Sequence, residues 1–258
     1  DETVLVSVIA ANSEIGTLQP LEAIGRVCAE RGVPLHSDAA QAVGKIPLDV
    51  EALGVDLLSF SAHKLYGPKG VGALYARRRR RDGRRLRIAP MLHGGGHERG
   101  LRSGTLPVPL VAGFAQAVTL CLEDREAEAE RLAGLRDHLL ARLREDPGEV
   151  ALNGHATRRL PANLNLSFEG VPADALLPEV PELALSTGSA CSSARPEPSH
   201  VLRALGLPPE RVQGALRIGL GRGTTREDVD FAAERLAAAV RRLRERVPPR
   251  LASRPADR

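Results

Sequence analysis

Short apolar runs alternate with a helical segment in the first quarter of the chain, and this alternation constrains the fold most strongly. Residues 4–11 form a short, almost uninterrupted apolar run, which is typical of a strand buried on both faces. Residues 20–32 begin with proline and end near glycine, as many helices do. Two further runs end at His36 and Phe60. This order predicts an α/β fold with a mainly parallel sheet and helices on its faces.

Polar residues stand where these predicted strands end. Asp38 closely follows the run that ends at His36, and Lys64 follows the run that ends at Phe60. Because parallel neighbours present their carboxyl ends at one edge of a sheet, the two side chains are expected to flank one ligand pocket. An aspartate at this position could instead cap the next helix, and that alternative stays open.

Lysine is rare in this chain. Only three of the 36 basic residues, Lys45, Lys64 and Lys69, are lysines, and the others are arginines. Arginine stays protonated, whereas a lysine amine that is desolvated at a strand end can lose its proton and condense with a carbonyl group. Residues 59–70 therefore predict a strand, a reactive lysine, a turn and a second strand. The alternative is a surface lysine beside a turn.

The composition indicates a globular protein. With 258 residues, of which 43% are hydrophobic, the chain can form one large domain or two smaller ones. No stretch approaches the ~20 apolar residues of a membrane span, and no signal-like pattern opens the chain, which favours a cytoplasmic protein without membrane contact. The chain opens on a predicted strand, and its single methionine is Met91. We therefore expect it to be part of a longer protein.

A run of arginines, residues 77–81, contributes much of the net charge of +4. Such a run could contact nucleic acid or an acidic protein. Because no aromatic residue is interleaved with the arginines, a solvated surface loop is favoured, and no direct contact with nucleic acid is expected.

The three cysteines, Cys28, Cys121 and Cys191, are an odd and widely spaced set, which indicates neither a disulfide framework nor a zinc site. Cys28 and Cys121 lie on the apolar sides of predicted helices. Cys191 lies within residues 186–194, which are all small. This segment predicts an accessible, nucleophilic thiol, and a buried, inert thiol is the alternative.

A glycine-rich segment, residues 93–105, predicts a loop that binds phosphate through backbone amides and hydroxyl groups. His93, His97 and Glu98 could instead form a metal cluster, but they lack the spacing that places metal ligands on one face of a helix.

A long helical pattern, residues 107–143, is expected to bend or break near Glu123 and to mark a domain boundary. We predict a large domain, residues 1–122, and a small α+β domain, residues 123–258. Thr224 and Glu227 are predicted as the capping box of the last helix. The small domain has predicted strands near 150–152, 163–168, 183–186 and 215–220, predicted helices near 199–205 and from 225 onward, and an apolar stripe formed by Val229, Leu236, Val240, Leu243 and Val247.

Taken together, these motifs resemble the cysteine desulfurases of the iron–sulfur-cluster and nitrogen-fixation type, which are aminotransferases of class V with the aspartate aminotransferase fold. The resemblance covers nearly the whole chain, and its motifs occur in the order of the family. The stretches that carry it are residues 12–16, 36–41, 59–70, 93–105, 186–193 and 216–222.

The resemblance implies a binding site for pyridoxal 5'-phosphate. Lys64 would bind this cofactor covalently, Asp38 would pair with its pyridine nitrogen, and Gln41 would bond its ring hydroxyl. Ser61 and His63 would hold the phosphate. The cofactor would then act as an electron sink while Lys64 removes the Cα proton of the bound substrate, L-cysteine.

The resemblance also implies a homodimer, in which Thr105 reaches the phosphate of the other subunit. Arg217 would bind the substrate carboxylate with its planar fork. Cys191 would take the sulfur as a persulfide, leaving L-alanine, and would pass it to an acceptor protein such as an iron–sulfur scaffold. Asn12 and Ser13 belong to the implied cofactor-binding set.

Two departures from the family pattern stand out. Ser13 replaces an asparagine that usually bonds the ring oxygen of the cofactor, so this contact is expected to depend more on Gln41. The first third of the family pattern, with a phosphate-binding threonine and a ring-stacking histidine, has no counterpart. The alternatives are therefore a selenocysteine lyase, an aminotransferase, or an inactive remnant that serves as a dimer partner or scaffold.

Overall fold

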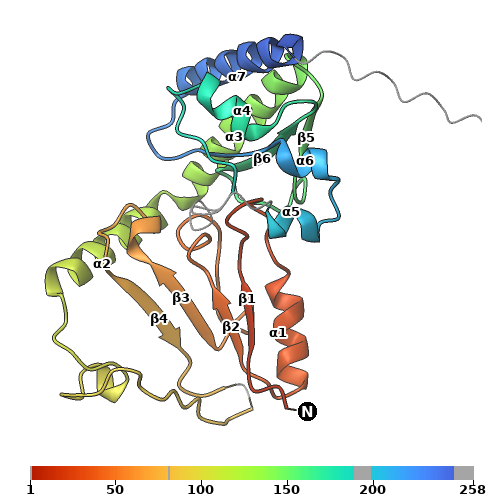
Figure 1. Cartoon of the computed structure of the whole chain (residues 1–258). Helices are drawn as coiled ribbons and strands as arrows, with labels where there is room; N and C mark the ends of the chain where they lie inside the picture. Colours follow the sequence, from red (N-terminus) through yellow and green to blue (C-terminus); the bar gives the residue numbers. More distant parts are fainter. Residues whose placement is uncertain (1, 81, 189–198, 247–258) are drawn as a thin grey trace, which may run out of the picture. The chain divides into compact units, whose positions relative to one another are not determined.

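The computed structural model describes residues 2–80, 82–188 and 199–246 (Figure 1). The chain divides into two compact units. Unit 1 comprises Asp1–Asn12 and Thr17–Ala129, and unit 2 comprises Ser13–Gly16 and Glu130–Arg258. The predicted domain boundary after residue 122 stays a prediction.

Unit 1 contains a four-stranded sheet in the order β1 (Val6–Ile9), β2 (Leu35–Asp38), β3 (Leu57–Ser61) and β4 (Gly72–Ala76) (Figure 1). The pairs β1–β2 and β2–β3 are parallel, and β3–β4 is antiparallel. The antiparallel pair forms because only residues 62–71 join β3 to β4, and this connection is too short for a crossover helix. The sheet is therefore mainly parallel, as predicted.

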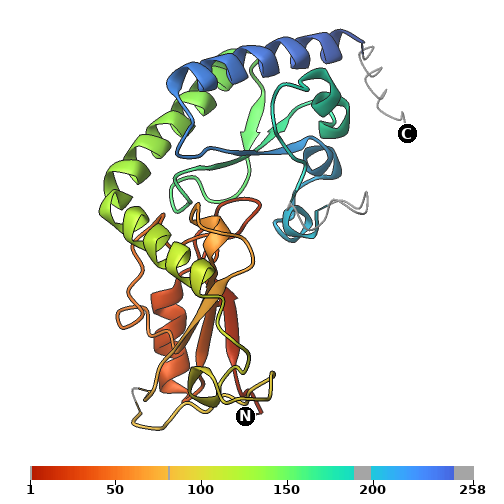
Figure 2. The same ribbon diagram turned by 90° about the vertical axis from the view of Figure 1, so that its left-hand side faces the viewer.

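Helix α1 (Leu21–Glu30) lies against one side of this sheet in both views (Figures 1 and 2). It buries Leu21 and Cys28, which confirms that Cys28 is a core residue. Gly25 is also buried, and a Cβ atom there would lie 2.2 Å from the carbonyl oxygen of Leu53. The absence of a side chain at Gly25 thus lets the helix approach the loop before β3 closely.

The other side of the sheet carries a row of polar side chains. The imidazole of His36 in β2 lies between two serine hydroxyls, with Nδ1 2.7 Å from Oγ of Ser7 and Nε2 3.1 Å from Oγ of Ser59. The strand alternation places Leu35 and Ser37 in the core and leaves Asp38 exposed.

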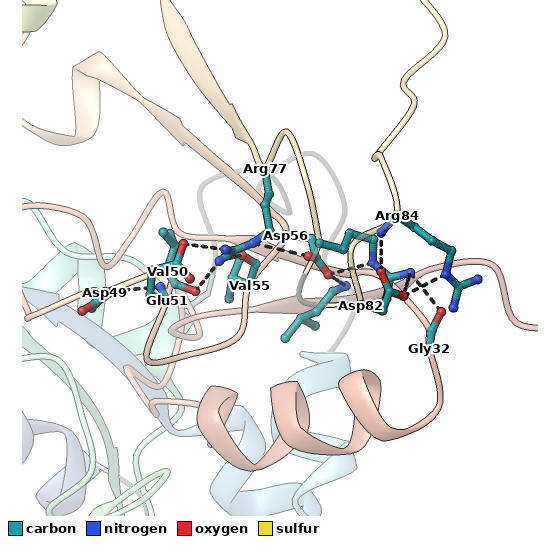
Figure 3. Close-up of polar contacts among 11 residues, drawn as sticks. Gly32, Asp49, Val50, Glu51, Val55, Asp56, Arg77, Asp82 and Arg84 are labelled. Atoms are coloured by element: carbon teal, nitrogen blue, oxygen red, sulfur yellow. Dashed lines mark hydrogen bonds and ion pairs between the residues drawn. The ribbon is translucent and has the colours of Figure 1, made fainter.

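The arginine run is only partly the solvated loop that the sequence predicts, because Arg78 and Arg79 are exposed but Arg77 and Arg80 are not. The Arg77 residue is only 8% exposed, and the side chain of Arg80 is only 9% exposed. The reason is Asp56, which lies beside Arg77 in Figure 3. One of its carboxylate oxygens is 3.5 Å from Nε of Arg77, and the other is 3.7 Å from Nε of Arg80. Arg77 also donates to the carbonyl oxygens of Val50 and Val55, both at 3.1 Å. Buried arginines of this kind fix the end of β4 to the loop before β3.

Helices α2 (Val108–Glu123) and α3 (Arg125–Glu145) meet at Asp124, which confirms the predicted break near Glu123. Phe114 and Cys121 of α2 pack in one apolar cluster with Ala62 and Leu65. The rings of Phe60 and Phe114 meet edge to face, with centroids 5.4 Å apart. Two 3-10 helices also belong to unit 1, namely η1 (Ala62–Lys64) and η2 (Glu98–Gly100).

Unit 2 contains an antiparallel sheet in the order β5 (Val150–Leu152), β6 (Asn163–Phe168) and β7 (Ala215–Gly219). Every residue of the central strand β6 is buried. The predicted strand near 183–186 is wrong, because within the described residues this segment makes only an isolated bridge between Ser186 and Arg217. The helices are α4 (Ala173–Leu176), η3 (Leu177–Glu179), α5 (His200–Ala204), α6 (Pro209–Gln213) and α7 (Arg226–Arg246).

Helix α7 covers the core of unit 2 with the predicted apolar stripe. Val229, Leu236 and Val240 are buried, Leu243 packs beside them, and Val247 lies outside the described residues. The capping box is shifted by one residue from its predicted position. Thr225 and Asp228 form it, with 3.2 Å from the Asp228 amide to Oγ1 of Thr225 and 2.9 Å for the reciprocal bond. None of the helices in the described ranges is long and apolar enough to cross a membrane.

Candidate functional site

Asp38 stands at the carboxyl edge of the parallel strands in unit 1. It is the last residue of β2, and its register neighbours are Ile9 in β1 and Ser59 in β3. The side chain is exposed, and its Oδ1 accepts a hydrogen bond of 2.9 Å from the amide of Ala40. The capping alternative is wrong, because turns and not a helix follow Asp38. One carboxylate oxygen closes the local turn, and the other makes no hydrogen bond within the described residues.

Lys64 lies in a turn whose neighbours are firmly held. The carbonyl oxygen of Ala62 accepts hydrogen bonds from the amides of Leu65 at 2.8 Å and Gly67 at 3.0 Å. Ala62 and Leu65 are both buried in the apolar cluster beside α2. Tyr66 has a φ of 62°, a conformation that costs a non-glycine residue about 1–2 kcal/mol. The turn is therefore fixed by packing on both sides of Lys64, whose own side chain is half-buried.

Lys45 is a charged neighbour of Lys64 that sequence reasoning missed. Burial lowers the pKa of Lys45 to about 8, and repulsion by the Lys64 ammonium contributes to the same shift. Its neighbour Gly44 has a φ of 73°, and a Cβ atom there would lie 2.6 Å from Leu65 and 3.0 Å from Cβ of Cys121. The rarity of lysine was the signal that could have drawn attention to Lys45 as well as to Lys64.

The remaining predicted cofactor ligands of unit 1 lie on loops around this edge. Ser61 ends β3, is half-buried, and uses its hydroxyl for no helix cap. His63 and Thr105 are exposed, and Gln41 is half-buried in the turn after β2. The amide of Asn12 donates to the carbonyl oxygen of Thr17 at 2.9 Å. No hydrogen bond joins the side chains of Ser61, His63, Thr105 and Gln41 to one another in the described residues, and the joint role of the set stays a prediction.

The glycine-rich loop is organised by its own backbone amides. The amide of Gly96 donates to Oγ of Ser103 at 3.2 Å, and the amide of Gly104 donates to Nδ1 of His97 at 3.2 Å. The bond from Gly104 occupies the lone pair of Nδ1, so this nitrogen cannot ligate a metal while the loop keeps this conformation. Thr105 follows directly, at the entrance to α2.

Arg217 in β7 is held from two sides within unit 2. Its Nε donates to Oγ of Ser186 at 3.1 Å, and its Nη1 donates to the carbonyl oxygen of Ser13 at 3.1 Å. The main chains of Arg217 and Ser186 also bond in both directions, at 2.7 and 3.4 Å. The guanidinium is half-buried, and within the described residues its Nη2 has no acceptor. An arginine of this kind can bind a carboxylate.

The segment Ser13–Gly16 belongs to unit 2 because its carbonyl groups are bonded there, and sequence reasoning did not predict this. Gly16 has a φ of 73°, and a Cβ atom there would lie 2.5 Å from Oδ1 of Asn163, so only glycine fits. All four carbonyl oxygens of the segment accept hydrogen bonds. The Ser13 oxygen accepts from the side chain of Arg217, the Glu14 oxygen from Asn163 and Asn165, the Ile15 oxygen from Arg159, and the Gly16 oxygen from the amide of Leu160.

Cys191, the predicted nucleophile, lies outside the described residues, and its role stays a prediction. The described chain before it ends at Gly188, whose carbonyl oxygen accepts a hydrogen bond of 3.2 Å from Oγ of Ser186. The two other cysteines, Cys28 and Cys121, are buried and form no disulfide within the described residues. Their burial makes them matched controls for any test of Cys191.

A mainly parallel sheet with a lysine at its carboxyl edge, and a second unit built on an antiparallel sheet, define an α/β protein of the aspartate-aminotransferase type. A solved structure described as a NifS-like protein superposes with a TM-score of 0.81 at 37% identity, covering 93% of this chain and 62% of that one. This similarity confirms the predicted fold class. A model of the aminotransferase class-V family matches residues 1–231, and the chain belongs to that family.

Two further relatives carry functional descriptions of their own. Cysteine desulfurase IscS of Methylococcus capsulatus is 52% identical over 247 residues, which cover 96% of this chain and 60% of the relative. The structure of SspA in complex with cysteine superposes with a TM-score of 0.66 at 36% identity, covering 84% of this chain and 59% of that one. The chain thus spans about 60% of the length of the curated relatives that it matches.

Proposed function

We propose that this chain belongs to a pyridoxal-phosphate-dependent cysteine desulfurase. The enzyme converts L-cysteine to L-alanine and transfers the sulfur to Cys191 as a persulfide, for iron–sulfur cluster, thio-cofactor or tRNA biosynthesis. The observation that carries the proposal is Lys64, which is fixed by buried neighbours at the sheet edge where Asp38 ends the adjacent parallel strand. The similarity to a relative described as a cysteine desulfurase supports it.

The donor set at this edge fits pyridoxal phosphate. Lys64 offers an amine for covalent attachment, Asp38 has a carboxylate oxygen available for the ring nitrogen, and Ser61 has a hydroxyl that caps no helix. His63 and Gln41 would complete the contacts to phosphate and ring hydroxyl. When bound, the cofactor supplies an electron sink for the carbon atoms of the amino acid.

The side chains of the chain itself then hold the substrate and move its proton. Arg217 binds the carboxylate of L-cysteine, and the Lys64 amine takes the proton from Cα. The Cys191 thiolate bonds to the substrate sulfur. The carbon–sulfur bond breaks, its electron pair stays with the carbon, and that carbon takes up a proton to give L-alanine.

A second copy of the chain is the partner that we propose for unit 1. Large apolar residues are exposed on both sides of Thr105, including Met91 at 93% and Val108 at 67%. Exposed apolar surface of this kind is typical of an interface. It would bring Thr105 to the phosphate bound by the other subunit. The persulfide sulfur would pass to an acceptor protein, such as an iron–sulfur scaffold.

The test compares two cysteine variants of the protein that carries this chain. Cys191→Ser should still bind the cofactor but should release no alanine from cysteine, because a hydroxyl is a poor nucleophile toward sulfur. Cys28→Ser, which changes a buried thiol in α1, should keep the parent rate. Alanine release by Cys191→Ser near the parent rate would show that Cys191 is not the acceptor.

A further inference from the structure

The contacts of Ser186 and Arg217 in unit 2 point to a further functional residue. We propose that Ser186 is a positioning residue, whose hydroxyl, together with the carbonyl oxygen of Ser13, orients the Arg217 guanidinium to receive the carboxylate of the amino-acid substrate. The inference rests on the proposed function, because it assumes that Arg217 binds the substrate carboxylate. Ser186 opens the small-residue segment that contains Cys191, but that segment alone does not indicate this role.

The hydrogen bonds already made by Arg217 determine which edge remains for a ligand. The guanidinium has five N–H groups. One on Nε points to Ser186 at 3.1 Å, and one on Nη1 points to Ser13 at 3.1 Å. Within the part of the chain that the structure describes, the second N–H of Nη1 and both N–H groups of Nη2 have no acceptor. These groups form the end of the fork, which matches the two oxygens of a carboxylate.

The backbone beneath Arg217 is rigid. Its neighbours Leu216 and Ile218 are buried, and β7 pairs with β6, the fully buried central strand. The side chain is nevertheless long and rich in rotamers, so the strand alone does not fix the direction of the guanidinium. Contacts at Nε and Nη1 are needed to fix it.

The Ser186 hydroxyl acts only as a hydrogen-bond acceptor toward Arg217. Its hydroxyl donates its single hydrogen to the carbonyl oxygen of Gly188 at 3.2 Å, which leaves the oxygen lone pairs for Nε of Arg217. The main-chain bonds between Ser186 and Arg217 keep the two residues opposite each other. The Ser13 contact is a main-chain carbonyl and cannot be deleted by substitution. Among the described residues, Ser186 is therefore the side chain through which this orientation can be tested.

Loss of the Ser186 hydroxyl should weaken carboxylate binding without changing the chemical step. One hydrogen bond of ordinary strength corresponds to a roughly twofold to twelvefold effect on binding. The same loss applies to ground state and transition state, because the carboxylate stays bound throughout. Ser186→Ala should therefore raise the KM for cysteine by about twofold to twelvefold and leave kcat nearly unchanged.

The experiment uses the cofactor-loaded protein and four variants. Ser186→Ala should raise KM, and so should Ser186→Cys, which is nearly isosteric but a weak acceptor. Ser186→Thr keeps the hydroxyl and should have the KM of the parent. Ser167→Ala is the structural control, because Ser167 is buried in β6 and donates to the carbonyl oxygen of Arg211 at 2.7 Å. It should lower the melting temperature and leave KM unchanged.

A second measurement needs no turnover. Phenylglyoxal modifies arginine side chains, and mass spectrometry follows the peptide that contains Arg217. Alanine should protect Arg217 in the parent, Ser186→Ala should require several-fold more alanine, and ethylamine, which lacks a carboxylate, should not protect. Protection at the same alanine concentration in both proteins, or an unchanged KM in both Ser186→Ala and Ser186→Cys, would overturn the inference. Absence of alanine release by the parent would instead refute the proposed function.

Discussion

Replacement of Asp56 by asparagine should destabilise unit 1, because Asp56 is the negative charge between two buried arginines. The residue is 7% exposed, and its Oδ2 also accepts a hydrogen bond of 3.1 Å from the amide of Leu35. Asparagine keeps an acceptor for Leu35 but removes the charge that faces Arg77 and Arg80 (Figure 3). Two guanidinium groups of like charge would then remain buried together.

The size of the destabilisation depends on the ion pairs that Arg77 and Arg80 keep in the variant. Breaking a buried ion pair by removing one partner costs about 3–5 kcal/mol. Arg77 keeps Glu51 at 2.5 Å and Arg80 keeps Asp82 at 3.2 Å, and these exposed partners offset part of the loss. We expect a net destabilisation of about 2–4 kcal/mol, which lowers the melting temperature of unit 1 by roughly 10 °C.

Tyrosine fluorescence can follow unit 1 separately. The chain has no tryptophan, and its two tyrosines, Tyr66 and Tyr75, both lie in unit 1. In urea, Asp56→Asn should shift the fluorescence transition while the helical circular dichroism of unit 2 changes less. The control is Asp49→Asn, because Asp49 is exposed and caps the amide of Glu51 at 2.8 Å, a role that asparagine fills equally well. Equal midpoints for the two variants would refute the reasoning about buried charge.

Two further predictions concern single side chains. Lys45→Met should stabilise the protein by about 1–2 kcal/mol at pH 7, because burial and Lys64 lower the pKa of Lys45 from 10.5 to about 8 in the folded state. Below pH 8 Lys45 is protonated in both the folded and the unfolded state, so the destabilisation by its buried charge is fully present; it disappears as the pH rises from 8 to 10.5. A stability difference between Lys45→Met and the parent that does not change with pH would contradict this. Gly16→Ala should cost at least about 2 kcal/mol, because a Cβ atom would lie 2.5 Å from Asn163 at a φ of 73°. Gly170→Ala has the same φ of 73° in open space and should cost only about 1 kcal/mol, so urea unfolding of the pair isolates the clash.

Local patterns predicted the parts of the fold that local physics determines. The break between α2 and α3, the burial of Cys28 and the stripe of Val229, Leu236 and Val240 follow from helical periodicity. The edge position of Asp38 and Lys64 follows from the order of strands, since parallel neighbours end at one edge.

Contacts between distant residues were not predictable in the same way. The arginine run resembles a solvated loop until Asp56 is known to lie beside it, and the sequence gives no sign of that pairing. Two adjacent threonines could each open α7. Only the structure shows that Thr224 accepts from the amide of Gly221 at 2.9 Å, which leaves the cap to Thr225. The bond from Arg217 to Ser13 joins residues from opposite ends of the chain, beyond the reach of any local pattern.

The most direct test of the proposed function is to locate the lysine that binds the cofactor. The protein is incubated with pyridoxal phosphate, reduced with borohydride and digested, and mass spectrometry identifies which of the three lysines carries the pyridoxyl group. Lys45 is a demanding internal control, because its lowered pKa makes its amine reactive as well. We predict the adduct on Lys64 alone and its loss in Lys64→Ala. An adduct on Lys45 or Lys69 that persists in Lys64→Ala would contradict the account.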